Sequence, residues 1–333
     1  MKEISRKNFL RTCGAIVAGG AVAGVSGVLI DRNRKASTPG KSLRLVEEKT
    51  FTSPYRLVSS FPAEAISGLA RQEDRLYVAA SRSVLVFDAE GKLLHQFATG
   101  EEAVRDIAVD AKGVYLLHPA RISVYTHGGE PIRSWEACSE LSNYCTFALA
   151  SGFVFVTDMD NKNICKYTEE GNFVKFIDSP NKFIIPSLTF GIEYIGGKLY
   201  CSNSGRHQVE MYSLDGEYLG SFGKPGGAPG LFTGCCNPVY ISQTSTGDVI
   251  TSEKGDPRIS CYGSDGSFRS LLLDSKSLGG GNTAYDVKVW KDKLFVAGKD
   301  KVSIYRYDAE LAAHSGACGG CGTDCPLRAG VMV

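Results

Sequence analysis

The chain has 333 residues, of which 43% are hydrophobic and 22% charged, and its formal net charge is +1. It is more than double the length of a typical domain but within reach of one large β architecture, and its composition excludes a disordered, collagen-like or multi-spanning membrane protein. The net charge excludes nucleic-acid binding through bulk positive charge, and 11 cysteines in so long a chain are too few for a disulfide-stapled miniprotein.

The first 41 residues are basic, with eight Lys or Arg against two acidic residues. They contain 18 uncharged residues, Cys13–Ile30, half of them Gly or Ala, which is typical of an export segment. The preceding stretch S-R-K-N-F-L-R, Ser5–Arg11, resembles a twin-arginine translocation signal with Lys7 in place of the second arginine, and an ordinary secretory signal is the alternative. We expect export across the cytoplasmic membrane, to the periplasm or cell surface. Residues 13–30, about 27 Å long as a helix, are long enough to be retained as a membrane anchor.

A short motif recurs six times: a β-branched residue, any residue, a mostly apolar position and then an aromatic residue. Its starts are 38, 42, 45, 50 and 43 residues apart, the length that four short antiparallel strands and their turns occupy. An alternating apolar segment precedes each copy, and several copies are followed by an Asp/Gly turn typical of a hairpin. The copies are Val84–Phe87, Ile122–Tyr125, Ile164–Tyr167, Val209–Tyr212, Ile259–Tyr262 and Val302–Tyr305.

These repeats predict an all-β fold, a six-bladed β-propeller, over residues 42–310. The sixth copy lacks a further strand after Asp308, whereas Tyr55–Ser59 reads as a strand ahead of the first blade. We therefore expect this N-terminal strand to complete the last blade and close the ring. Residues 1–41 form the predicted signal or anchor segment with its linker, and residues 311–333 form a cysteine-rich tail.

The fourth copy belongs to a longer stretch that reads S-G-R-H-Q-V-E-M-Y-S-L-D-G and continues through G-S-F-G and G-G-A-P-G-L-F, within residues 204–232. Over residues 60–308 or so the chain resembles NHL-repeat propellers, and Gly234–Pro238 with Ser252–Ile259 resembles a block of exported bacterial propellers of this type. The resemblance implies the propeller fold and an exported location. It implies no single activity, because the wider family includes lyases, hydrolases and binding platforms.

The tail contains three cysteines in a C-x2-C-x3-C-P pattern: Cys318, Cys321 and Cys325. This spacing resembles the end of a bacterial ferredoxin motif, so we expect an iron–sulfur cluster here, with Cys235 or Cys236 as the fourth ligand. Zinc is the alternative, because thiolates also satisfy its tetrahedral site. Disulfides or a flexible tail without a metal are the third interpretation.

Other cysteines lie within the repeats. The adjacent Cys235 and Cys236 are compatible with a strained vicinal disulfide, with metal ligation, or with one thiol turned inward and one outward at a strand start. In an oxidising compartment we expect a disulfide between Cys138 and Cys145.

Further candidate ligand residues lie in loops on the face that we expect to be functional. His118 and His207 lie at or just after the ends of second strands, and Glu253 directly follows the second strand of the fifth blade. Lys254, Asp256 and Arg258 form a charged loop of the same blade. An exposed, salt-bridged turn explains that loop, and anion binding at the channel mouth is the alternative. Asp and Asn side chains in such loops are also compatible with a calcium site of the lactonase type.

Together these features predict an exported or membrane-anchored propeller with an iron–sulfur or other metal centre, in electron transfer or in maturation of a redox complex, with an envelope protein as partner. The first alternative is a cofactor-free propeller that binds an envelope protein or ligand. The second is a metal-dependent hydrolase or lyase.

Overall fold

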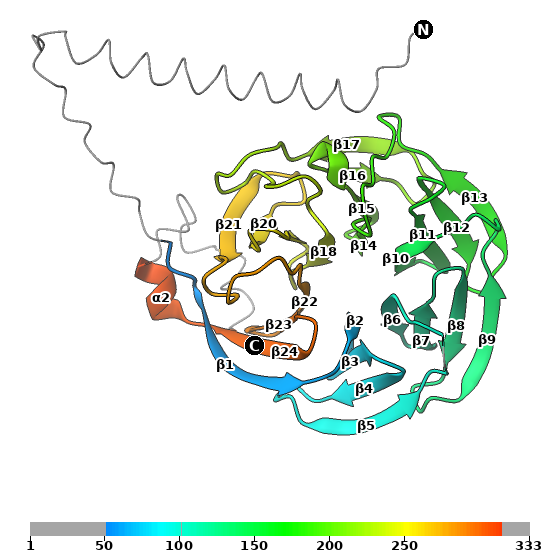
Figure 1. Ribbon diagram of the computed structural model, residues 1–333, viewed down its shortest axis with the longest axis horizontal. Coiled ribbons are helices and arrows are strands. Elements are labelled where there is room, and N and C mark those ends of the chain that lie inside the picture. The colour runs from blue at the N-terminus through cyan, green and yellow to red at the C-terminus, as the bar shows by residue number, and fades with distance from the viewer. Residues whose placement is uncertain (1–50, 101, 315–333) are drawn as a thin grey trace, which may run out of the picture. The chain divides into compact units, whose positions relative to one another are not determined.

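The computed structural model describes residues 51–100 and 102–314. Within these ranges, 24 strands form six antiparallel four-stranded sheets that surround a central channel as the blades of a ring (Figure 1). The predicted six-bladed propeller is therefore confirmed. The predicted segment 1–41 and the cysteine-rich tail lie outside the described ranges, apart from the start of the tail.

Each blade is built outward from the channel, and its strands fall into four positions. The inner strands are β2 (Ile66–Gln72), β6 (Asp106–Asp110), β10 (Tyr144–Ala150), β14 (Ile192–Ile195), β18 (Tyr240–Gln243) and β22 (Asp286–Trp290). The second strands are β3 (Arg75–Ala80), β7 (Gly113–Leu117), β11 (Phe153–Asp158), β15 (Lys198–Asn203), β19 (Val249–Ser252) and β23 (Lys293–Ala297).

The six recurring motifs occupy the third strands, as their spacing predicted. These are β4 (Ser83–Phe87), β8 (Arg121–Tyr125), β12 (Asn163–Thr168), β16 (Gln208–Tyr212), β20 (Ile259–Tyr262) and β24 (Lys301–Tyr307). The outer strands are β5 (Leu93–Ala98), β9 (Pro131–Glu136), β13 (Phe173–Ile177), β17 (Tyr218–Phe222), β21 (Phe268–Leu273) and, in blade 6, β1 (Tyr55–Pro62). Among the described residues, the helices are η1 (Ser204–Arg206) and α2 (Ala309–His314).

The ring closes through its N-terminal strand. β1 pairs antiparallel with β24, from Tyr55 opposite Tyr307 to Pro62 opposite Lys301. The expectation that a strand starting at Tyr55 completes the last blade is confirmed. Because β1 continues directly towards β2 of the first blade, this pairing joins the two ends of the ring.

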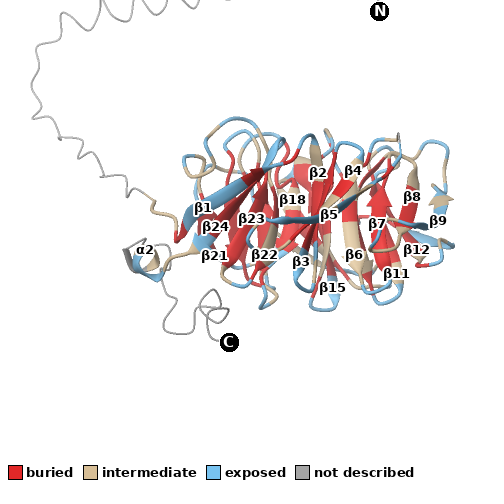
Figure 2. Cartoon of the chain, turned by 90° about the horizontal axis from the view of Figure 1, so that it is seen from below, coloured by how far each residue is buried: buried red, intermediate tan, exposed pale blue. Residues whose placement is uncertain are grey.

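The hydrophobic core lies between the blades. Six apolar clusters are each shared by two neighbouring blades. Along β3, Leu76 and Val78 pack towards blade 6, whereas Tyr77 and Ala79 pack towards blade 2. Successive side chains of β3 therefore enter two different apolar clusters, and second strands such as β3 are buried on both sides (red in Figure 2). The outer strand β5 is largely exposed.

The strand directions place the connecting loops on two faces. Because successive strands are antiparallel, the loops that lead into inner strands lie at the same end as the loops between second and third strands. We call this end the upper face. Among the helices that are described, none is long and apolar enough to cross a membrane.

Candidate functional site

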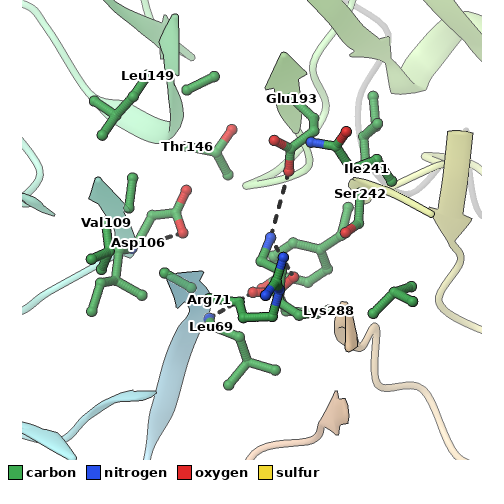
Figure 3. Close-up of a pocket in the computed structure, with 18 of the residues that line it drawn as sticks. Leu69, Arg71, Asp106, Val109, Thr146, Leu149, Glu193, Ile241, Ser242 and Lys288 are labelled. Atoms are coloured by element: carbon green, nitrogen blue, oxygen red, sulfur yellow. Dashed lines mark hydrogen bonds and ion pairs between the residues drawn. The ribbon is translucent and has the colours of Figure 1, made fainter. Parts of the chain in front are cut away.

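A cavity of about 770 Å³ occupies the centre of the ring and is lined by the inner strands of all six blades (Figure 3). A second cavity of about 260 Å³ lies at its upper mouth, beside the start of β2 and the loop between β23 and β24. Tyr240 and Asp286 line both cavities, so these two side chains stand between the mouth and the channel.

Four ionisable side chains from three blades line the channel. Lys288 Nζ lies 3.5 Å from Glu193 Oε2 and 3.6 Å from Asp286 Oδ1, and Figure 3 shows the first of these contacts across the cavity from Asp106. The ammonium group of Lys288 therefore forms ion pairs with two carboxylates. The fourth side chain, Asp106, forms no ion pair with any residue that the structure describes.

The carboxyl group of Asp106 is held by backbone amides of two blades. Its Oδ1 accepts the N–H of Ile107 at 2.8 Å, and its Oδ2 accepts the N–H of Phe147, in β10, at 3.2 Å. On the other side lies Gly68 of β2, where a Cβ atom would come within 2.8 Å of Asp106 Oδ1. Because glycine has no Cβ atom, there is room beside position 68 for the carboxyl of Asp106, and any larger residue there would displace that carboxyl.

The electrostatics of the channel follow from this geometry. Burial and the negative charge of Asp286 raise the pKa of Asp106 to about 8, although Lys288 and the two backbone amides oppose the shift. Burial opposes the charge of Lys288, but the carboxylates Asp286 and Glu193 outweigh it and raise the pKa of this ammonium group. At neutral pH the channel therefore contains a charged Lys288 and a protonated Asp106.

The predicted Cys235 and Cys236 lie on the upper face, in the loop that leads into β18. They are free thiols with their Sγ atoms 3.2 Å apart. Cys235 is exposed and Cys236 is 4% exposed, as the interpretation with one thiol outward and one inward expected. Among described residues, no three His, Cys, Asp or Glu side chains gather as metal ligands. Cys318, Cys321 and Cys325 lie outside those residues, so the iron–sulfur centre stays a prediction.

The charged loop of blade 5 differs from expectation. Arg258 is 5% exposed and not part of an exposed turn, because its Nη2 lies 2.9 Å from Glu253 Oε2 and its guanidinium also donates to the carbonyls of Gly227 and Leu231. This buried pair ties the loop between β19 and β20 to the loop before β18. Lys254 points elsewhere: its Nζ donates to Ser187 Oγ at 3.0 Å.

The two histidines are not brought together. His118, in blade 2, is fully buried, and its Nδ1 lies 3.2 Å from the Ala103 carbonyl while its Nε2 has no partner in the described part of the chain. Burial lowers the pKa of His118, against the opposing charge of Glu102. His207, in blade 4, places Nε2 2.7 Å from the Gly234 carbonyl. Neither histidine lines the central channel.

The expected disulfide between Cys138 and Cys145 is not formed. Cys138 Sγ lies 3.8 Å from Cys165 Sγ, whereas Cys145 packs in the apolar cluster between blades 3 and 4. Spacing along the chain favoured the pair, but the two cysteines lie on opposite sides of blade 3. Cys138 lies on the side of blade 2, where its N–H donates to Tyr167 Oη at 3.0 Å, and Cys145 packs towards blade 4.

Four channel residues were not among those predicted from the sequence: Asp106, Glu193, Asp286 and Lys288. Their one signal is a charged side chain in a short apolar segment, such as Asp286 and Lys288 in D-V-K-V-W. Such residues are ordinary on a half-exposed strand, so the signal becomes meaningful only when inner strands are known to converge.

The comparisons agree with the fold. Virginiamycin B lyase from Staphylococcus aureus superposes with a TM-score of 0.53 at 14% identity, covering 76% of this chain and 99% of that one. A streptogramin B lyase gives 0.54 at 14% identity, covering 76% and 97%. The WD40 propeller domain of Doa1 gives 0.51 at 10% identity, covering 74% and 80%. No family model and no curated protein matches the sequence. At these identities the likeness supports the class, a β-propeller, and nothing about activity, whereas the number of blades, six, comes from the six four-stranded sheets of this protein.

Proposed function

We propose that this protein is an exported binding propeller whose central channel takes a small organic cation, such as an aliphatic amine. The observation that carries this proposal is Asp106, a carboxyl group in the channel with no basic partner among the described residues. The export signal predicted in residues 1–41 supports the exported location.

The channel offers an apolar wall and a carboxyl group, the two features that a site for an aliphatic amine needs. Its volume of about 770 Å³ falls in the range of about 300–1,000 Å³ usual for small-molecule sites. Val109 and Leu149, which are partly exposed to the channel, supply apolar wall for methylene groups (Figure 3). An ammonium group beside Asp106 would favour the ionised carboxylate and lower its pKa, so binding near neutral pH would release a proton. Lys288 is already neutralised by Glu193 and Asp286, which limits its repulsion of a second cation.

Isothermal titration calorimetry with putrescine, compared with uncharged 1,4-butanediol, tests the proposal. We expect saturable binding of putrescine, much weaker binding of the diol, and an affinity for putrescine that rises as pH approaches 8. Asp106→Asn should remove this pH dependence, and Asp265→Asn, at an exposed loop residue, should leave it unchanged. Equal binding of amine and diol, or no binding of putrescine at millimolar concentration, would reject the cation site.

The electron-transfer function expected from the cysteine tail is a second candidate. It is supported by one structural observation, a free and exposed Cys235 thiol on the upper face. The test is the iron, zinc and acid-labile sulfide content of full-length protein purified without oxygen, beside a variant with Ala at Cys318, Cys321 and Cys325. Iron and sulfide that disappear in the variant support a cluster, zinc alone supports the alternative, and metal-free protein rejects both.

A further inference from the structure

The loop that carries Cys235 and Cys236 is fixed at both ends. Before the thiols, the N–H and Oγ1 of Thr233 donate to Glu253 Oε2 at 2.7 and 3.1 Å. After them, Asn237 Nδ2 donates to the carbonyls of Thr233 and Lys254 at 2.7 and 2.9 Å, and Asn237 Oδ1 accepts the Lys254 N–H at 2.9 Å. The two sulfur atoms therefore face each other in a clamped segment.

The surroundings of the two thiols are unequal. Cys235 is exposed, so its sulfur is open to a reactant from solution. Cys236 is buried, and its Sγ lies 3.8 Å from Ser187 Oγ, which accepts a hydrogen bond from Lys254 Nζ at 3.0 Å. Because the cationic Lys254 reaches Cys236 through this serine, a negative charge on Cys236 would be stabilised more than one on the exposed Cys235.

Adjacency adds strain to any bond between these sulfurs. The peptide that joins the two cysteines is trans, so their Cα atoms lie about 3.8 Å apart, below the usual 4.4–6.8 Å of disulfides. Strained and exposed disulfides are the more readily reduced ones. A disulfide in this loop would therefore act as an oxidant.

We propose that Cys235 and Cys236, which are free thiols in this structure, form a thiol–disulfide exchange site that passes oxidising equivalents between external thiols. An external disulfide first oxidises the pair and becomes a dithiol, and the disulfide of the pair then oxidises a second external dithiol. One thiolate of the dithiol attacks Cys235 Sγ, the sulfur–sulfur bond of the pair breaks, and Cys236 leaves as a thiolate beside Lys254. The second thiolate of the dithiol then attacks the external sulfur of the mixed disulfide and releases Cys235. Two electrons and two protons pass to the cysteine pair, and the dithiol becomes a disulfide.

The experiment uses full-length protein that has been oxidised with diamide, which takes two electrons and two protons from a pair of thiols, and then freed of it. Dihydrolipoate or a reduced C-x-x-C peptide is added, samples are quenched with acid and alkylated, and the peptide that contains both cysteines is quantified by mass spectrometry. We expect this peptide to begin bridged and to become doubly alkylated, with one external disulfide formed per pair. Reduction by either probe supports the site, and the faster probe identifies whether the dithiol is a small molecule or a protein segment.

Variants separate this site from the other thiols. Cys235→Ser should abolish the exchange, whereas Cys138→Ala should not affect it. Lys254→Met should slow reduction severalfold and Lys254→Arg should restore it, because a cation stabilises the departing thiolate. The proposal is overturned if the peptide stays fully alkylated after oxidation, if Cys235 instead bridges to another cysteine, or if Lys254→Met, folded by circular dichroism, reacts at the wild-type rate.

Discussion

Asp286 Oδ2 accepts the backbone N–H of Leu69 at 2.7 Å, although 217 positions separate the two residues in the chain. The bond joins the inner strand of blade 6 to that of blade 1. It closes the ring at the channel, as the pairing of β1 with β24 closes it in blade 6.

Loss of this bond should therefore weaken the whole ring. Asp286→Ala leaves the buried N–H of Leu69 without an acceptor and Lys288 with one carboxylate fewer, so we expect a loss of about 1–3 kcal/mol in the free energy of unfolding. Asp286→Asn keeps an acceptor oxygen and should lose less. Urea unfolding followed by tryptophan fluorescence measures both, and equal stability of wild type and Asp286→Ala would contradict this role.

The raised pKa of Asp106 predicts a dependence of stability on pH. Between the ordinary pKa of 3.8 and about 8, the folded protein holds a proton that the unfolded chain has released. The contribution of this group to the free energy of unfolding therefore falls as pH rises through that range. Asp106→Asn cannot titrate. Its stability relative to wild type should increase by about 1.4 kcal/mol per pH unit between pH 5 and about 8, and then level off towards pH 9. Urea unfolding at pH 5, 7 and 9 measures the difference, and a constant difference would show that the pKa of this carboxyl is not raised in the folded protein.

His118 predicts sensitivity to acid. Burial lowers its pKa, so below the ordinary value of 6.5 the unfolded chain binds a proton that the folded protein does not, and stability falls as pH falls. His118→Asn keeps a donor for the Ala103 carbonyl but does not titrate. Its thermal midpoint should fall less than that of wild type between pH 7.5 and pH 5. Parallel falls in both proteins would place the acid sensitivity elsewhere.

The buried pair Glu253 and Arg258 should be costly to break. Arg258→Met leaves the fully buried Glu253 carboxylate without its cation, and we expect a loss of about 3–5 kcal/mol. Arg75→Met is the matched control, because Arg75 pairs with Asp74 at 4.0 Å on the surface and should change stability by less than about 1 kcal/mol. Chemical denaturation compares the two.

Because Thr233 is bound to Glu253, Arg258→Met should also speed alkylation of Cys236, and unchanged alkylation would argue against the clamp.

Much of the fold could be read from local patterns. The motif that ends at Tyr125 or Tyr262 marks a third strand. Its spacing of 38 to 50 residues gives the length of one blade, and its six copies give the number of blades. The free strand at Tyr55 identified the closing partner of β24. These features depend on neighbouring residues and on the residues that one blade needs, so they are visible in the sequence.

Tertiary structure alone decided which side chains meet. Asp106, Glu193 and Lys288 belong to separate repeats and share the channel only because six inner strands converge when the ring closes. Likewise, Cys138 lies beside Cys165 and not beside Cys145, although Cys145 is closer in sequence, because Cys165 and Cys145 pack on opposite sides of blade 3. The sequence by itself determined the blades and their order, since these arise from short-range periodicity. The channel chemistry arises from contacts between residues far apart in the chain, which only the closed ring brings together.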